Sequence, residues 1–237
     1  MPRMARIVVP LYPHHVTQRG NRRQPTFFGT ADYREYLRLI ERAKRRSGVT
    51  ILAYCLMPNH VHFAVVPQHR GSLHQFFAEA HRRYSYRINR REGWHGHLWQ
   101  SRFYSNAMDE AHLISTVRYI ELNPVAAGLC LRPEEWPWSS VHAHLLQVDD
   151  RLVSVAPMLE RVSDWREYLA APELDSNLVS IRKHARTGRP LGSEDFLQEI
   201  ELITGRSLRN KKPGRRSDNP SGTALDSHES AGLSTNK

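Results

Sequence analysis

An apolar run over residues 54–66 is interrupted by two histidines, His60 and His62, that are separated by a single residue. In a β-strand, successive side chains point to opposite faces of the sheet, so the two imidazoles share one face. Val61 and Phe63 point to the other face. One face of this strand is therefore expected to belong to the core, while the other carries the imidazoles.

The paired imidazoles have two interpretations. Histidines at this spacing on a strand can direct their nitrogens at one divalent metal ion, but they can also simply cap a polar sheet surface. The short motif alone does not decide between these interpretations. A second match to the same spacing, His95 and His97, spans a glycine in an expected loop, and we do not interpret it as a metal site.

Apolar periodicity elsewhere predicts an α+β domain around this strand. Strands are expected at 14–20, 49–57 and 60–66 and within 94–108, and helices at 32–46, from 72 to about 93, and from Asp109 onward. The strands at 49–57 and 60–66 are joined by a Pro-Asn pair, which is typical of an antiparallel hairpin.

The helix that begins at Asp109 has an apolar and a polar face. The apolar face consists of Leu113, Ile114, Val117 and Ile120. The polar face, repeating at helical spacing, consists of His112, Thr116, Tyr119 and Asn123. A tyrosine can act as a nucleophile, and an asparagine one turn later can supply an oxygen ligand to a metal. Alternatively, Asn123 merely ends the helix before Pro124, and Tyr119 lies flat on the surface.

The charge of the chain favours a polyanionic partner. Lys and Arg number 34 against 24 Asp and Glu, which gives a net charge of +10 and a pI near 10.0. Nucleic acid is the expected partner, with anionic membrane surfaces as the alternative. No run approaches the ~20 apolar residues of a membrane span, and the N-terminal apolar run is too short for a secretory signal. With only Cys55 and Cys130, no disulfide framework is expected, and we predict a cytoplasmic protein that does not enter a membrane.

Several basic and aromatic side chains are candidates for contact with DNA. They are Arg19, Arg22 and Arg23 after the first strand, Arg83 and Tyr86 on the second helix, Arg102 in the following loop, and Arg209, Lys211, Lys212 and Arg215 near the C-terminus. Arginines can hold phosphates and a tyrosine can stack on a base. A solvated loop, a half-exposed tyrosine and a solubilising tail are the respective alternatives.

The chain divides into three parts by composition. Residues 1–147 carry the motifs and form the expected catalytic domain. Residues 148–205 are a C-terminal helical extension, with short helices around Trp165 and Tyr168 and an amphipathic helix at 193–203. Residues 206–237 form a basic tail without aromatic side chains, which we predict to be disordered, most clearly from Ser217.

Five segments taken together resemble one known family. They are 57–62 (Met-Pro-Asn-His-Val-His), 98–102 (Leu-Trp-Gln-Ser-Arg), 118–129 (Arg-Tyr-Ile-Glu-Leu-Asn-Pro-Val-Ala-Ala-Gly-Leu), 138–140 (Trp-Ser-Ser) and 187–192 (Thr-Gly-Arg-Pro-Leu-Gly). In order and spacing they resemble the REP-associated tyrosine transposases, which belong to the HUH single-tyrosine transposases of small insertion sequences. The similarity runs from about His15 to Ser140, so it is far more specific than the histidine pair alone.

This resemblance implies a fold and a chemistry. The fold would be a ferredoxin-like or RRM-like antiparallel sheet with helices on one face and the active site on the other, beneath the tyrosine helix. His60, His62 and Asn123 match the family's metal ligands for Mg²⁺ or Mn²⁺, and Tyr119 matches its catalytic tyrosine. The implied reaction is cleavage and rejoining of single-stranded, hairpin-forming DNA through a 5′-phosphotyrosine and a free 3′-OH.

Two other functions stay open. A replication or mobilisation nickase of the same broader class would use similar groups, and a catalytically silent nucleic-acid-binding module would keep the sheet and the charge. His112 and Thr116 are candidates, by position only, for assisting deprotonation of Tyr119. A monomer and a homodimer both fit the sequence.

Overall fold

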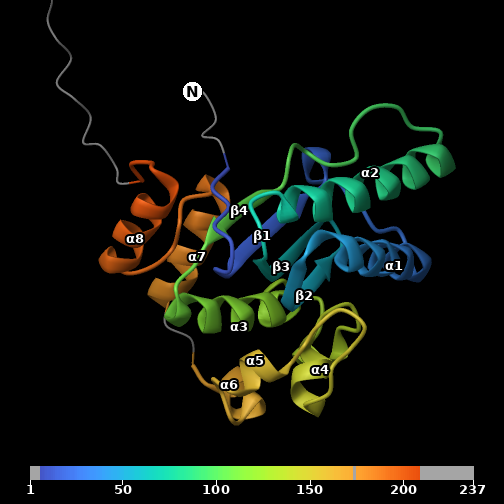
Figure 1. Cartoon of the computed structure of the whole chain (residues 1–237). Coiled ribbons are helices and arrows are strands. Elements are labelled where there is room, and N and C mark those ends of the chain that lie inside the picture. Colours follow the sequence, from blue (N-terminus) through green and yellow to red (C-terminus); the bar gives the residue numbers. More distant parts are fainter. Residues whose placement is uncertain (1–5, 173–174, 209–237) are drawn as a thin grey trace, which may run out of the picture.

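The computed structural model describes residues 6–172 and 175–208. Its centre is a four-stranded antiparallel sheet in the order β2-β3-β1-β4 (Figure 1). The strands are β1 (His14–Arg19), β2 (Val49–Met57), β3 (His60–Pro67) and β4 (Tyr104–Ala107). β2 and β3 form the hairpin predicted from the Pro-Asn pair.

The strand register decides which side chains share a face of the sheet. His62 of β3 lies opposite Thr17 of β1, and Arg19 lies opposite His60. Because partners in an antiparallel pair point to the same side, His15, two residues before Thr17, also shares the face of the imidazole pair. The opposite face of β3 presents Val61, Phe63 and Val65, all fully buried.

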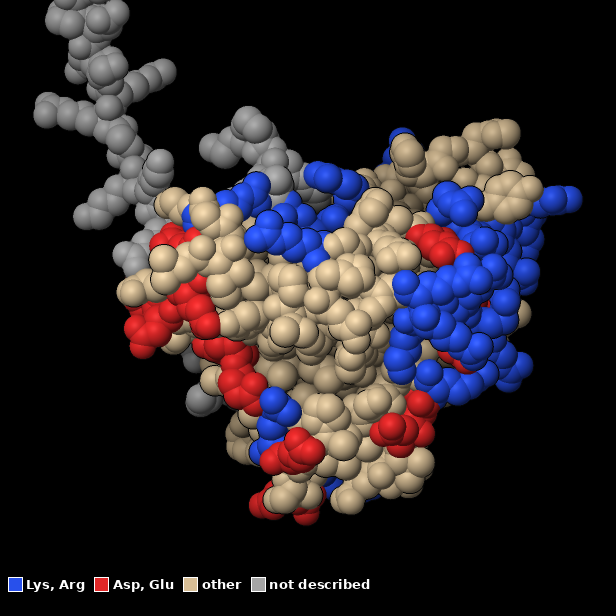
Figure 2. Space-filling model, viewed as in Figure 1, with Lys and Arg blue, Asp and Glu red and all other residues tan. Residues whose placement is uncertain are grey.

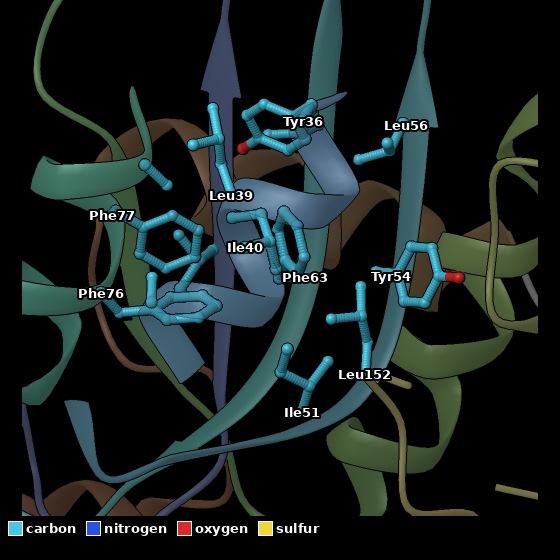
Figure 3. Close-up of a cluster of buried hydrophobic side chains, with 14 of the residues drawn as sticks. Tyr36, Leu39, Ile40, Ile51, Tyr54, Leu56, Phe63, Phe76, Phe77 and Leu152 are labelled. Carbon is cyan, nitrogen blue, oxygen red and sulfur yellow. The ribbon is translucent and has the colours of Figure 1, made fainter. Parts of the chain in front are cut away.

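Two long helices cover that apolar face (Figure 1). They are α1 (Thr30–Ser47) and α2 (Ser72–Glu92), which pack against each other and against the sheet. Figure 3 shows Tyr36 and Ile40 of α1 and Phe76 and Phe77 of α2 gathered around Phe63. The first helix ends where predicted, because Gly48 adopts a left-handed conformation with φ of 60° that favours glycine at a helix end.

A third helix, α3 (Glu110–Ala126), covers the other face of the sheet (Figure 1). Asp109 caps it by accepting a hydrogen bond from the backbone N–H of His112. The apolar side of α3 buries Leu113, Val117 and Ile120 against Met57 and other apolar residues of the sheet. This packing fixes the rotation of α3 and therefore the direction of its polar stripe.

The remaining helices extend the structure beyond α3 and along the edge of the sheet at β4. They are α4 (Val141–Leu146), α5 (Ala156–Leu159), α6 (Trp165–Ala170), α7 (Asp175–Thr187) and α8 (Glu194–Thr204), with short 3-10 turns η1 (Asn21–Arg23) and η2 (Pro133–Glu135). Single bridges connect Ile51 to Val153 and Met108 to Leu191. The division at residues 147 and 205 stays a prediction, and the predicted disorder from Ser217 lies outside the described residues.

The predicted fold class is confirmed: the chain has an antiparallel sheet with α1 and α2 on one face and the tyrosine helix α3 on the other. Cys55 is buried, Cys130 is half-buried, and neither forms a disulfide. Among the described helices, none combines the length and apolar character needed to cross a membrane.

Candidate active site

The imidazoles of His60 and His62 lie side by side on the face of the sheet beneath α3. Their ring centroids are 4.9 Å apart, and His62 is buried while His60 is partly accessible. Burial lowers the pKa of His60 to about 4 and the pKa of His62 well below its usual value, with nearby positive charges adding to the effect. Both rings are therefore neutral at physiological pH, which is the form that binds a metal ion.

Hydrogen bonds occupy the same atom of both rings. The Nδ1 atom of His60 lies 2.6 Å from the Oδ1 atom of Asn59, and the Nδ1 atom of His62 lies 3.0 Å from the Nε2 atom of His15. The Asn59 amide is itself oriented, because its Nδ2 atom donates to the Arg23 carbonyl. Within the described part of the chain, the Nε2 atoms of His60 and His62 make no hydrogen bond with another residue, so both are available to bind a ligand.

Tyr119 stands beside these imidazoles rather than flat on the surface. Its ring centroid is 5.6 Å from that of His62 and 6.1 Å from that of His15, in both cases edge to face. The residue is half-buried on α3. The structure thus brings together the phenol and the histidine pair, which are far apart in the sequence.

Asn123 lies one helical turn after Tyr119 and is half-buried. Side chains four residues apart share one face of a helix, so Asn123 belongs to the Tyr119 stripe. The alternative that Asn123 only ends the helix is wrong, because α3 continues through the buried Pro124 to Ala126.

The residue types present form a mixed set of ligands, because imidazole is an unusual ligand for a hard Mg²⁺ ion whereas an amide oxygen suits it. No three His, Cys, Asp or Glu side chains in the described ranges converge as a metal site, so a site on His60 and His62 needs a ligand of another kind. The amide oxygen of Asn123 is suited to Mg²⁺ or Mn²⁺. Two neutral imidazoles with free Nε2 atoms agree with such a site.

Three of the predicted DNA-contacting arginines lie at the edge of the histidine pair. Arg19 is the register partner of His60, and Arg22 and Arg23 follow it in an exposed turn. Arg22 and Arg23 have φ values of 53° and 63°, which are unusual for residues other than glycine. The turn is held to the strand hairpin because the Gly20 N–H donates to the Asn59 carbonyl.

The other predicted DNA contacts divide into three groups. Arg83 and Tyr86 lie on α2, on the far side of the sheet from Tyr119, and Tyr86 is 66% exposed. Arg102 is exposed in the loop whose Gln100 N–H donates to the Arg19 carbonyl, so it lies near the end of β1. Arg209, Lys211, Lys212 and Arg215 lie outside the described residues.

The helices α1 and α2 carry much of the positive charge of the chain. Together they contain eleven Lys and Arg but only five Asp and Glu residues. Figure 2 shows these basic side chains gathered over the side of the molecule formed by the two helices. A groove between the helices is lined by Arg38, Arg82, Arg83, Tyr86, Arg87 and Arg90, together with Glu35, Leu39 and Arg91.

The two candidate helpers of Tyr119 differ in exposure, because His112 is half-buried and Thr116 is fully buried. The Nδ1 atom of His112 lies 2.6 Å from the Asp109 carboxylate, which holds it at the start of α3. Thr116 is fully buried, and its hydroxyl has no hydrogen-bond partner among the described residues. His95 and His97, set aside above, are exposed in the loop after α2.

Sequence reasoning missed two groups that contact the Tyr119 ring, His15 and Arg182. The Cζ atom of Arg182, on α7, lies 6.0 Å from the ring centroid. His15 belongs to a strand whose pairing with β3 cannot be read from its own residues, and Arg182 comes from a helix distant in sequence. No local pattern marks either residue.

Sequence reasoning also missed a buried carboxylate on α3, the helix that carries Tyr119. Glu121 is fully buried, and its Oε1 atom accepts hydrogen bonds from Ser140 Oγ and His144 Nδ1, each at 2.6 Å. Its Oε2 atom accepts one from Trp165 Nε1 at 2.8 Å. Glu121 therefore joins α3 to the segments that carry α4 and α6.

Comparison with known proteins agrees with this site. A family model described as "Transposase IS200 like" matches residues 8–123, which include both histidines and Tyr119. Through this segment the chain is similar to the IS200-like transposases. No match was found among curated proteins.

Two solved structures are similar to this chain. A REP-associated tyrosine transposase bound to a REP hairpin aligns with a TM-score of 0.54 and 22% identity, over 65% of this chain and 92% of that one. A putative transposase from Deinococcus radiodurans R1 aligns with a TM-score of 0.34 and 21% identity, over 51% of this chain and 96% of that one. The first similarity supports the assigned fold.

Proposed function

We propose that this chain cleaves and rejoins single-stranded DNA with Tyr119 as the nucleophile. The observation that carries the proposal is the edge-on placement of the Tyr119 ring against His62, 5.6 Å between centroids, within the segment matched by the transposase family. Tyr119 is only partly buried against the apolar cluster that Leu113, Val117 and Ile120 fill, so its phenol beside two neutral imidazoles is available for chemistry.

His60, His62 and Asn123 would hold the metal ion, Mg²⁺ or Mn²⁺. When bound, such an ion supplies positive charge that polarises the scissile phosphodiester and stabilises the charge of the transition state. The protein's own contribution is to keep the two imidazoles neutral and oriented, which burial and the two Nδ1 hydrogen bonds achieve.

Tyr119 would attack the phosphorus atom in line with the departing 3′ oxygen. The bond between the phenol oxygen and phosphorus forms while the bond to the 3′ oxygen breaks, and the phenol loses its proton as the 3′-OH gains one. Because the reaction replaces the DNA phosphodiester by a phosphodiester to tyrosine, the energy of the bond is conserved. A second 3′-OH can therefore reverse the step and join two strands without ATP. Holding the phenol near the phosphate lowers the entropic cost of the attack.

The positive charge of the chain would bind the substrate in two places. Arg19, Arg22 and Arg23 border the histidine pair and would hold the phosphates of the strand being cut. The basic groove between α1 and α2 faces away from Tyr119 and would hold a more distant part of the DNA, such as the stem of a hairpin. Exposed Tyr86, in this groove, offers a surface on which a base could stack.

The decisive experiment measures a covalent protein–DNA adduct. Wild-type protein is mixed with 5′-labelled and 3′-labelled hairpin oligonucleotides carrying single-stranded flanks, in the presence of Mg²⁺ or Mn²⁺, and the products are resolved under denaturing conditions. We expect an adduct with the strand 3′ of the break and a free 3′-OH on the other fragment. Tyr119→Phe should bind the same DNA without forming the adduct.

One control variant and one result of the wild-type protein define the outcome. Tyr104→Phe removes the hydroxyl of another partly exposed tyrosine, on β4, and should leave adduct formation unchanged. If the wild-type protein binds hairpin DNA but never forms an adduct with either metal, the chain is a silent binding module and the proposal fails.

A further inference from the structure

His15 is a third histidine of the site, and it reaches His62 from the neighbouring strand. Its Nε2 atom lies 3.0 Å from His62 Nδ1, and the two rings are nearly parallel, with an interplanar angle of 17°. His15 is 1% exposed, so neither solvent nor an exposed side chain competes for this hydrogen bond.

We propose that His15 is a positioning residue that fixes the tautomer and orientation of His62, leaving the Nε2 atom of His62 free as a metal ligand. The inference rests on the function proposed above, and it assigns to His15 a role toward His62 rather than toward the metal or the DNA. Residues that hold the second nitrogen of a ligating histidine orient the ring and increase its basicity.

His60 and His62 each have a hydrogen-bond partner at the Nδ1 atom. Asn59 accepts from the Nδ1–H of His60, and His15 occupies the corresponding Nδ1 atom of His62. A neutral imidazole carries one proton, so a ring that donates through Nδ1 keeps its lone pair on Nε2. The same tautomer in both rings would direct two lone pairs outward from the sheet face beneath Tyr119.

The position of the proton on the His15 ring follows from this arrangement. If His62 donates through Nδ1, then His15 accepts at Nε2 and carries its own proton on Nδ1. That Nδ1 atom is buried and makes no hydrogen bond to any described residue. Asn106, the register partner of His15 on β4, also buries both atoms of its amide without a partner, and it can accept this proton directly or through a water molecule.

Buried polar groups near His15 make no hydrogen bond to any described residue. They include His15 Nδ1, the Asn106 amide and the hydroxyl of Thr116, one turn before Tyr119, and other unpaired buried groups, such as Ser47 and Trp99, lie elsewhere in the described part of the chain. Unpaired buried polar groups cost free energy, so a partner for His15 Nδ1 would stabilise the arrangement.

The test uses the full chain and two variants of His15. His15→Phe keeps the shape of the ring but removes both nitrogens, whereas His15→Gln keeps an acceptor oxygen at the same distance from the backbone. We expect His15→Phe to weaken Mn²⁺ binding by about 10- to 100-fold, as measured by titration without DNA, and His15→Gln to stay within about 3-fold of the wild type.

His14 provides the matched control. It is the next residue on β1, fully buried on the opposite face, with its own hydrogen bonds to Val9 and Tyr12. His14→Gln should lower the free energy of unfolding while leaving Mn²⁺ affinity unchanged. A loss of affinity that simply follows stability across these variants would overturn the proposal.

A second readout reports the tautomer directly and does not depend on a variant that folds. Nitrogen NMR of the imidazoles in metal-free wild-type protein should show the proton of His62 on Nδ1, whereas a metal bound at Nε2 would itself impose this tautomer. A proton on Nε2 contradicts the proposal, and so does equal loss of metal affinity in His15→Phe and His15→Gln. Failure of adduct formation by a wild-type protein with the expected tautomer would instead count against the proposed function alone.

Discussion

The ring of Tyr119 meets the imidazole of His62 edge to face, with an interplanar angle of 90° and 5.6 Å between centroids. The two residues come from α3 and β3, and nothing in the local sequence of either requires the other. They meet because Val117 and Ile120, fully buried beside Tyr119 on α3, anchor the helix across this face of the sheet. The core packing therefore places the phenol of Tyr119, the proposed nucleophile, beside a potential metal site.

The two groups of arginines should contribute differently to the reaction. Replacing Arg82 and Arg87 together by alanine removes two exposed cations from the groove between α1 and α2. If each holds one phosphate, hairpin binding should weaken, and the slope of log K against log salt should fall by about 1.5 to 2. The rate of adduct formation at saturating DNA should not change, because the groove faces away from Tyr119.

Arg19→Ala should give the opposite result. Arg19 is the register partner of His60, so its loss should slow adduct formation at saturating DNA more than it weakens hairpin binding. Arg166→Ala, an exposed arginine on α6, is the control and should change neither quantity. Equal behaviour of the Arg19 and Arg82/Arg87 variants would show that the two surfaces are not separate.

Acid should destabilise the protein well above the pH at which carboxylates titrate. Burial lowers the pKa of His14 and His60 to about 4 and of His15 and His81 to about 3. In the unfolded chain these groups bind protons near pH 6.5. As the pH falls below 6.5, the unfolded state therefore binds protons that the folded state does not bind. Stability is complete above pH 6.5 and should fall as the pH drops toward 4.

Each such histidine should remove on the order of 1 kcal/mol of unfolding free energy by pH 5.5. Urea unfolding between pH 7.5 and 5.5 measures the slope. His81→Gln, far from Tyr119 on α2, should reduce the slope by about one proton, whereas His74→Gln, exposed on the same helix, should not. A pH-independent stability over this range would contradict the assigned burial.

The sequence alone was sufficient to predict the position of a residue where that position depends only on the strand or helix that contains it. Strand alternation placed His60 and His62 on one face, and helical spacing placed Tyr119 and Asn123 on one stripe. Likewise, Gly48 marked the end of α1 because a left-handed residue is needed there.

The sequence was insufficient where a role depends on pairing between elements. The contact of His15 with His62 needs the β1 to β3 register, and two adjacent histidines in β1 look alike until the sheet separates their faces. Glu121 looks like an ordinary helical glutamate between Tyr119 and Asn123, yet its partners lie in segments that follow α3. Such pairings are set by tertiary packing and leave no periodic signal.

Arg182 should assist the reaction at Tyr119 through its charge. Its guanidinium lies 6.0 Å from the centre of the phenol ring, at the outer limit of a cation–π contact worth about 0.5–1 kcal/mol at an exposed site. Arg182→Gln should therefore slow single-turnover adduct formation by about 2- to 5-fold. Lys183→Gln, at the next residue, which is also exposed, is the control. Equal slowing in both variants would indicate a general effect of charge.

The buried Glu121 should hold the tyrosine helix in its working position. Removing its side chain in Glu121→Ala leaves Ser140, His144 and Trp165 without their acceptor, so we expect a loss of about 3–5 kcal/mol of unfolding free energy. Glu121→Gln keeps the shape but presents a donor to one of these donors, and should cost about 1–3 kcal/mol.

Glu110→Gln is the matched control on the same helix, because Glu110 is exposed and pairs only at the surface with Arg161. It should change stability by less than about 1 kcal/mol. Glu121→Gln should also slow adduct formation under conditions where the protein stays folded, since a small shift of α3 moves Tyr119, two residues earlier, relative to His62. If Glu121→Gln loses stability but keeps the wild-type rate, the carboxylate supports the fold without controlling the position of the phenol.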